Sequence, residues 1–156
     1  MRLAPHIAFS ATAGAAVWAG TGDPYAIPVA VAAGVLPDGD HVLDYYVRYV
    51  KRRRRFMFLI LHGWEYLGAM LLTYFLWIDE PWVLAMAAGY ATQIGGDQIF
   101  NRVKWHTYLL SARIYFRFDM YRIRGVPMIE GYMALVDSLP YIGRKFVKPW
   151  FESRSR

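Results

Sequence analysis

Histidine and carboxylate side chains inside apolar stretches are the residues of this chain that could do chemistry. Ionisable groups in apolar surroundings are costly, and they usually face a partner or a cavity. Spacing pairs some of them, since His62 and Glu65 share one face of a helix. Imidazole nitrogens and carboxylate oxygens suit Zn²⁺, Mn²⁺ or Fe²⁺, which lower the pKa of water toward about 7. The predicted metal ligands are His6, Asp38, Asp40, His41, His62, Glu65 and Asp97.

Each of these residues also has a structural interpretation. The Pro-Asp-Gly sequence at 37–39 is an ordinary turn pattern. His62 could be a buried core histidine, Glu65 could pair with the basic run 51–55, and Asp97 could neutralise a following arginine. A metal site therefore requires that the folded chain bring these side chains together at the same depth of the helix bundle.

Composition limits the class of protein. The chain has 156 residues, of which 56% are hydrophobic and 19% charged, whereas globular chains average roughly a quarter charged. This excludes disorder for most of the chain, and the length excludes a multidomain enzyme. The absence of cysteine excludes disulfides, thiolate metal sites and thiol nucleophiles.

Four apolar stretches must position the candidate ligands: 3–20, 25–36, 56–78 and 81–94, the last extending to 100. The third has about the length needed to cross a hydrocarbon core of roughly 30 Å. The second is short and contains Pro28, which suits a tilted, broken or re-entrant segment. We expect an all-α integral membrane bundle of about four helices over residues 1–100, with a soluble helical core as the alternative.

The charges predict an orientation. The basic run 51–55 lies between the second and third stretches, whereas the loops 21–24 and 79–81 carry only acidic charges. By the positive-inside rule, both termini are expected in the cytoplasm, and we expect a bacterial inner membrane. This topology places every candidate ligand at the cytoplasmic end of the bundle.

Residues 101–156 are expected to form a basic, aromatic cytoplasmic tail. They hold eleven Lys and Arg against four Asp and Glu. Residues 104–124 could form an amphipathic helix that lies on anionic lipid head groups, although 113–118 would also fit a short strand. Nucleic acid is not an expected partner because no recognition motif accompanies the basic residues. The sequence does not indicate an oligomeric state.

The motifs resemble a family, the YdjM-like membrane-bound metal-dependent hydrolases. The family has an N-terminal histidine, a Leu-Pro-Asp-x-Asp-His motif, a histidine-containing helix and a final Gly-Tyr-x-x-His-x-x-x-Asp helix. In this sequence the corresponding residues are His6, then Leu36-Pro37-Asp38-Gly39-Asp40-His41, then Leu61-His62-Gly63-Trp64-Glu65, and finally Gly89-Tyr90 with Gln93 and Asp97.

The resemblance implies hydrolysis of a phosphoester or related ester, since the family is distantly similar to helical zinc-dependent phospholipase C. We expect zinc as the metal, and Asp40 and Glu65 as catalytic carboxylates. Two departures favour manganese or magnesium instead: Gln93 stands at the family's usual histidine, and the third motif has His62 alone where two histidines are common. The alternative is a catalytically degenerate membrane protein whose basic tail binds anionic lipid or a protein partner.

Overall fold

The computed structural model describes residues 3–101, 103–124 and 140–155. All regular elements in these ranges are helical, and an isolated antiparallel bridge joins Phe56 to Asp119. In chain order the elements are α1 (Leu3–Thr21), α2 (Ala26–Val35), η1 (Leu36–Gly39), α3 (Asp40–Tyr45), η2 (Tyr46–Val50), α4 (Trp64–Leu76), α5 (Pro81–Phe100), η3 (Trp105–Tyr108), α6 (Leu110–Tyr115), α7 (Met120–Ile123), α9 (Pro140–Ile142), η4 (Gly143–Val147) and α10 (Lys148–Ser155).

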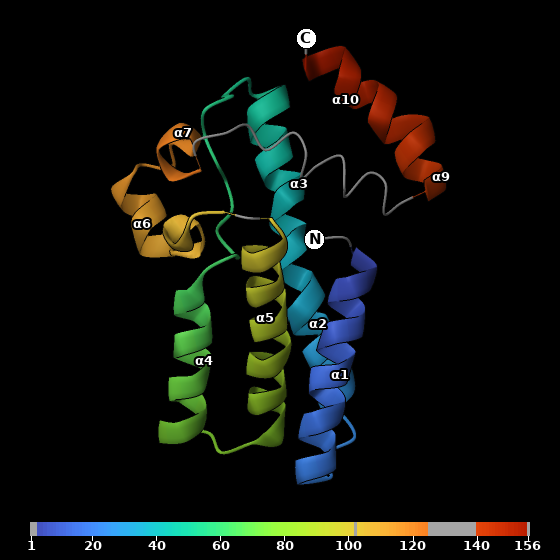
Figure 1. The fold of residues 1–156 in the computed structure, drawn as a ribbon, viewed down its shortest axis with the longest axis vertical. Coiled ribbons are helices and arrows are strands. Elements are labelled where there is room, and N and C mark those ends of the chain that lie inside the picture. The colour runs from blue at the N-terminus through green and yellow to red at the C-terminus, as the bar shows by residue number, and fades with distance from the viewer. Residues whose placement is uncertain (1–2, 102, 125–139, 156) are drawn as a thin grey trace.

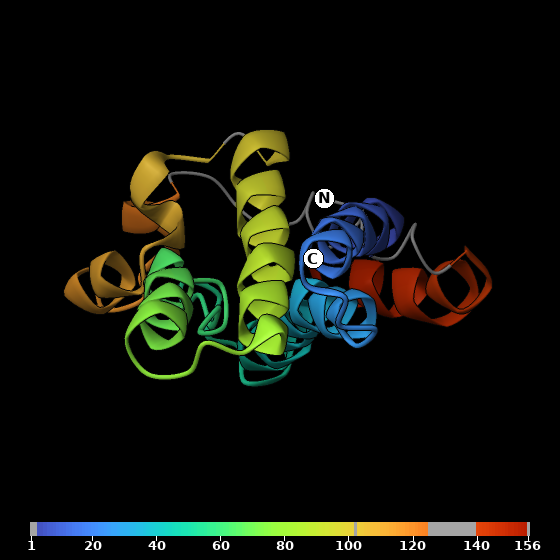
Figure 2. The same cartoon turned by 90° about the horizontal axis from the view of Figure 1, so that it is seen from below.

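Helix α5 is the central element of the bundle. The short loops after α1 and α4 lie at the lower end of the molecule in Figure 1, so α1 and α4 begin, and α5 ends, at the upper end of this helix bundle, near the middle of the picture. Seen from below, α5 lies between α4 on one side and α1 with α2 on the other (Figure 2). The all-α prediction is confirmed, and α1 and α5 match the expected stretches 3–20 and 81–100.

Small residues let α1, α2 and α5 approach at backbone contact. A methyl group at Gly89 of α5 would overlap the carbonyl of Ala30 in α2. At Gly14 of α1, an added Cβ would lie 2.8 Å from the carbonyl oxygen of Ala26. Close packing of this kind needs residues without bulky side chains at the crossing points. The three helices therefore form one tightly packed unit.

The second apolar stretch is longer than the sequence indicated. α2, η1, α3 and η2 follow one another without a break as a single helical run, Ala26–Val50. Pro37 lies in the first turn of η1, where the run passes from α-helical to 3-10 helical geometry. Within the described residues this run of 25 residues is the helix that is long and apolar enough to cross a membrane.

The third apolar stretch is only partly helical, so the expected helix over 56–78 is wrong in its first third. Residues 56–63 are not helical, and α4 begins at Trp64. The backbone N–H of Met57 donates to Phe118, and the N–H of Met120 donates to Arg55. These contacts with a distant segment replace the helical hydrogen bonds that the apolar run would otherwise make.

The segment expected as one amphipathic helix over 104–124 folds back on residues 55–63 as shorter helices. Its apolar side chains complete a small second core with Met57 and Leu59, to which it contributes Met120 and Ile123. In the C-terminal part, Trp150 packs on the ring of Tyr45 at 5.0 Å between centroids. The rest of the expected tail, at 102, 125–139 and 156, lies outside the described residues.

Candidate metal centre

Four parts of the chain bring candidate ligands to one end of the bundle. His6 lies in the second turn of α1, on the same buried face as Ser10 and Gly14. The turn from η1 into α3 contributes Asp38, Asp40 and His41, the loop before α4 contributes His62, and the last turns of α5 contribute Gln93 and Asp97. This is the end at which α1 and α4 begin and α5 ends (Figure 1).

The side chains meet in a continuous set of short contacts. Nε2 of His6 lies 3.3 Å from Oδ1 of Asp97, whose other oxygen lies 3.5 Å from Nε2 of His62. The same His62 nitrogen lies 3.3 Å from Oδ1 of Asp38. His41 approaches that Asp38 oxygen from the adjacent turn, at 3.8 Å from its Nε2.

Two overlapping groups of these residues could each hold a metal ion. One consists of Asp38, His41 and His62, and the other of His6, Asp38 and Asp97; within each group the ligand atoms all lie within 4.8 Å of one another. Asp38 belongs to both groups. It is grouped with His41 and His62 on one side and with His6 and Asp97 on the other. The set offers only nitrogen and oxygen atoms, which suits Zn²⁺ or Mn²⁺.

Asp40 contacts the opposite side of the His62 ring. Its carboxylate lies 3.1 Å from Nδ1 of His62 and also accepts the backbone N–H of Leu61 at 2.8 Å. This orients the ring so that Nε2 faces Asp38 and Asp97, an arrangement common for metal-binding histidines. The position suits an orienting residue better than the catalytic carboxylate that the sequence suggested.

The charge around His62 favours a cation at this place. Burial acts to lower the pKa of His62, but contacts with Asp38, Asp40 and Asp97 outweigh it and hold that pKa well above its ordinary value. Three carboxylates thus converge on one fully buried imidazole. A divalent ion could take over the neutralising role that a proton otherwise has.

Buried polar atoms without hydrogen bonds provide a second test of the fit. Both ring nitrogens of His6, Nε2 of His62 and Oε1 of Gln93 are buried and make no hydrogen bond. Leaving such atoms unsatisfied costs about 1–3 kcal/mol each, so native structures usually account for them. The Nε2 atoms of His6 and His62 each lie 3.3 Å from a carboxylate oxygen, of Asp97 and Asp38 respectively, a spacing that a metal ion held between nitrogen and oxygen would fit.

The amide of Gln93 is part of the cluster. Its Nε2 donates to Oδ1 of Asp38 at 2.6 Å, and the side chain is fully buried. The glutamine therefore stands within reach of both potential metal groups, at the place where the resemblance expects a histidine.

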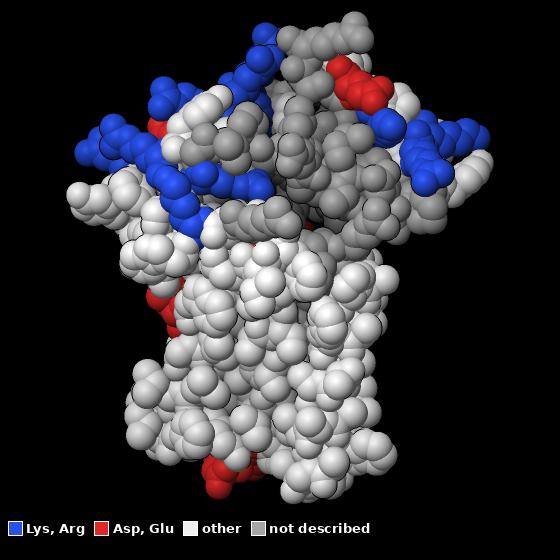
Figure 3. Space-filling model, in the orientation of Figure 1, with Lys and Arg blue, Asp and Glu red and all other residues white. Residues whose placement is uncertain are grey.

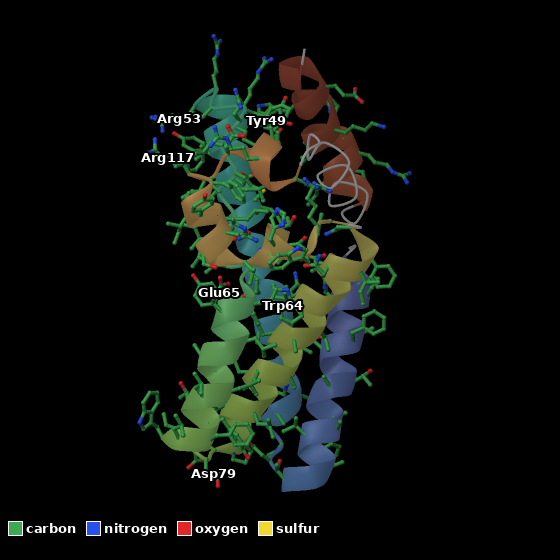
Figure 4. All side chains as sticks on the ribbon, turned by 60° about the vertical axis from the view of Figure 1, so that its left-hand side comes forward. Tyr49, Arg53, Trp64, Glu65, Asp79 and Arg117 are labelled. Carbon is green, nitrogen blue, oxygen red and sulfur yellow. The ribbon has the colours of Figure 1, made fainter. Side chains whose placement is uncertain are left out.

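Glu65, by contrast, belongs to neither group. Its carboxylate accepts the backbone N–H groups of Leu110 and Ser111 and the hydroxyl of Ser111, each at 2.8 Å. Figure 4 shows its side chain at the outer side of α4, beneath α6. It caps the first turn of α6, so in the described residues its carboxylate is held by Leu110 and Ser111 and not, as the sequence left open, by the basic run 51–55.

Tyr90 and Arg113 position the loop that carries His62. The hydroxyl of Tyr90 contacts the backbone of Leu61 and Gly63, at 2.7 Å from the Leu61 carbonyl oxygen. The fully buried guanidinium of Arg113 donates to the carbonyls of Leu59 and His62, and to that of Thr107 at 2.9 Å. Sequence reasoning missed both roles; the Gly-Tyr motif was a signal for Tyr90, but an arginine in a basic, aromatic segment gave none for Arg113.

The cluster is closed on most sides and open at one. Among its members, His6, Asp40, His62, Gln93 and Asp97 are at most 2% exposed. The side chains of Asp38 and His41 are 14% and 19% exposed. Asp38 and His41 are therefore the most exposed edge of the cluster.

Comparisons of this chain with protein-family models, with curated proteins and with solved structures found no match in any of the three.

Proposed function

We propose that this protein is a membrane-bound metal-dependent hydrolase that cleaves a phosphoester or a related ester. The observation that carries the proposal is the convergence of His6, Asp38, His62 and Asp97, from four separate parts of the chain, in one buried cluster. Burying several imidazoles and carboxylates together is costly, so a fold that gathers them has a use for them.

The surface of the bundle supports a place in a membrane. None of the residues of α4 is buried, and Phe75 and Trp77 at its end are 73% and 77% exposed. Figure 3 shows Lys and Arg at the upper end of the visible face, above a lower part of the described residues that carries neither. Asp79 lies at the lower tip (Figure 4), so the charge asymmetry agrees with termini and metal centre on the cytoplasmic side.

A bound divalent ion would supply the Lewis acidity that lowers the pKa of water and polarises the ester. The chain's own residues would bind the ion and orient its ligands. His6, His41, His62, Asp38 and Asp97 form the ligand set, with Asp38 shared between the two groups. Asp40 fixes the ring of His62, which leaves Nε2 pointing to the site. The buried walls exclude water from all sides but that of Asp38 and His41.

A catalytically degenerate membrane protein is the second candidate, and Gln93 is the observation that favours it. An amide is a weaker zinc ligand than imidazole. In addition, its Nε2 occupies one oxygen of Asp38, the carboxylate that the two ligand groups share. In this case the cluster stabilises the fold, and the protein acts by binding lipid or a protein partner.

Metal content separates the two candidates. The full chain, purified in detergent without chelator, should contain one or two equivalents of a divalent metal, and Asp38→Ala and His62→Ala should lose most of it. His106→Ala is the matched control, because His106 belongs to neither group, and it should retain the metal. Hydrolysis of generic phosphomonoesters and phosphodiesters should follow the metal. If the wild-type protein contains no metal, or if the two variants keep theirs, the metal-dependent hydrolase is wrong and the catalytically degenerate membrane protein is favoured.

A further inference from the structure

A second site lies away from the metal cluster, on the basic surface. Residues 52–55 and Phe56 face Arg117, Phe118 and Asp119 across an open hollow of about 460 Å³, which we call the arginine hollow. Arg53 and Arg117 come from opposite walls of it, and Figure 4 shows both side chains at the same outer edge of the molecule.

The backbone of the arginine hollow is unusual. Within the described residues, the non-glycine residues with positive φ are Arg52 (56°), Arg117 (52°) and Phe118 (56°), and all three line the hollow. A left-handed conformation costs an ordinary residue roughly 1–2 kcal/mol. Such strain persists where surrounding contacts enforce it, and it gathers at functional sites. Here the N–H of Phe118 donates to Arg113 and its carbonyl accepts from Met57.

The charge of the hollow is strongly positive. It is lined by five arginines and one aspartate, a net charge of +4. Asp119 pairs with Arg55 at 2.9 Å, and Arg55 also lies over the ring of Tyr121. Arg52, Arg53, Arg54 and Arg117 therefore line a hollow whose one lining carboxylate already has a partner. Like charges that line one hollow repel, and an anion bound between them would relieve this repulsion.

We propose that the arginine hollow binds the phosphate group of an anionic lipid. Arginine binds phosphate oxygens through paired N–H donors and does so better than lysine at such sites. The hollow opens beside the stacked rings of Phe56 and Phe118, 5.5 Å apart, which offer an apolar surface next to the charges. This choice of a lipid over a free anion rests on the membrane location proposed above, and it is independent of the metal.

The test is a titration of the full chain in a neutral detergent. The probes are dihexanoyl phosphatidic acid, dihexanoyl phosphatidylcholine, inorganic phosphate and a single-stranded oligonucleotide. We expect saturable binding of phosphatidic acid and at least tenfold weaker binding of the other three. Equal binding of inorganic phosphate would show a free-anion site, and tighter binding of the oligonucleotide a nucleic-acid surface; either result overturns the lipid assignment.

Variants locate the binding. Arg53→Gln with Arg54→Gln should weaken phosphatidic acid binding about 25-fold, at about fivefold for each guanidinium, which corresponds to about 1 kcal/mol. Arg144→Gln with Lys148→Gln removes the same charge outside the hollow and should change binding less than threefold. Arg117→Gly should weaken binding about fivefold without lowering thermal stability, since glycine tolerates positive φ.

An equal loss of affinity in the two double variants would overturn the proposal, because the attraction would then be a general effect of net charge. A loss of binding in Arg117→Gly that tracks a loss of stability would overturn it as well. Metal content, measured on the same samples, should be unchanged by any of these substitutions. If the protein contains no metal but still binds phosphatidic acid, the proposed hydrolase activity is wrong and the proposed lipid site is supported.

Discussion

Replacing Arg113 should destabilise the protein and empty the metal centre, because its guanidinium holds the backbone of His62 rather than a ligand atom. Its guanidinium donates to the carbonyls of Leu59, His62 and Thr107. These bonds tie the non-helical loop before α4 to the segment after α5. Arg113→Met fills much of the same space but leaves three buried carbonyls without donors.

The size of the effect follows from these contacts. A hydrogen bond to a charged group contributes about 1.5–3 kcal/mol, and burying the charge opposes this by several kcal/mol. Breaking a buried network of this kind costs about 3–5 kcal/mol in net terms. For a chain of this length, about 2–4 °C of melting temperature corresponds to each kcal/mol, so Arg113→Met should melt about 6–20 °C lower. Arg113→Lys keeps the positive charge but loses the paired N–H donors of the guanidinium. Its melting temperature should lie between those of wild type and Arg113→Met.

Thermal unfolding in detergent and metal content, measured on the same preparations, check the prediction. Arg122→Met is the matched control, because Arg122 lies on the exposed surface of α7 in the same segment. It should melt within about 2 °C of wild type, as surface substitutions usually do. If Arg113→Met instead melts at the temperature of the control and keeps its metal, the loop is positioned without the guanidinium, contrary to the prediction.

Three further substitutions test other parts of the structure. Gln93→His should raise zinc affinity at least tenfold in a chelator competition, and an unchanged affinity would show that residue 93 does not reach the ion. Gly89→Ala should cost about 1–3 kcal/mol because the methyl group meets Ala30, whereas Gly68→Ala, with open space around it, should be neutral in the same unfolding assay. Glu65→Gln should lower stability by about 1 kcal/mol through the weakened cap of α6 and leave metal content unchanged; loss of metal would return Glu65 to the ligand set.

Local pattern was enough to predict two of the four apolar helices, α1 and α5. α1 and α5 are long, apolar and bounded by turns, so the length of each apolar stretch gave its helix almost to the residue. The stretch 56–78 has the same composition but is helical only from Trp64. Apolar runs cannot distinguish a helix from a buried extended segment. Residues 56–63 are not helical because the backbone N–H groups of Met57 and Met120 bond to partners distant in sequence. Hydrophobic periodicity does not reveal such bonds.

The candidate site was predictable where a rare residue type in an apolar stretch has few other uses. His6 and Asp97 were found in this way, and they lie in contact. Glu65 was assigned by its spacing from His62 on one helix face, but His62 precedes the helix, so the spacing does not apply. Arg113 falls in the segment 104–124 that the sequence predicted to lie on lipid head groups, whereas the three carbonyls around it explain why it is buried instead.

The dependence of the His62 loop on Arg113 has a consequence for how the protein is made. A growing chain that has reached Asp97 already contains every proposed ligand, and α1, α2 and α5 can pack. The loop with His62 acquires its guanidinium donors only after residues 105–115 have also been synthesised. All the proposed ligands are therefore synthesised before Arg113, which positions the His62 loop. A nascent chain at that stage would bind metal less tightly than the finished protein.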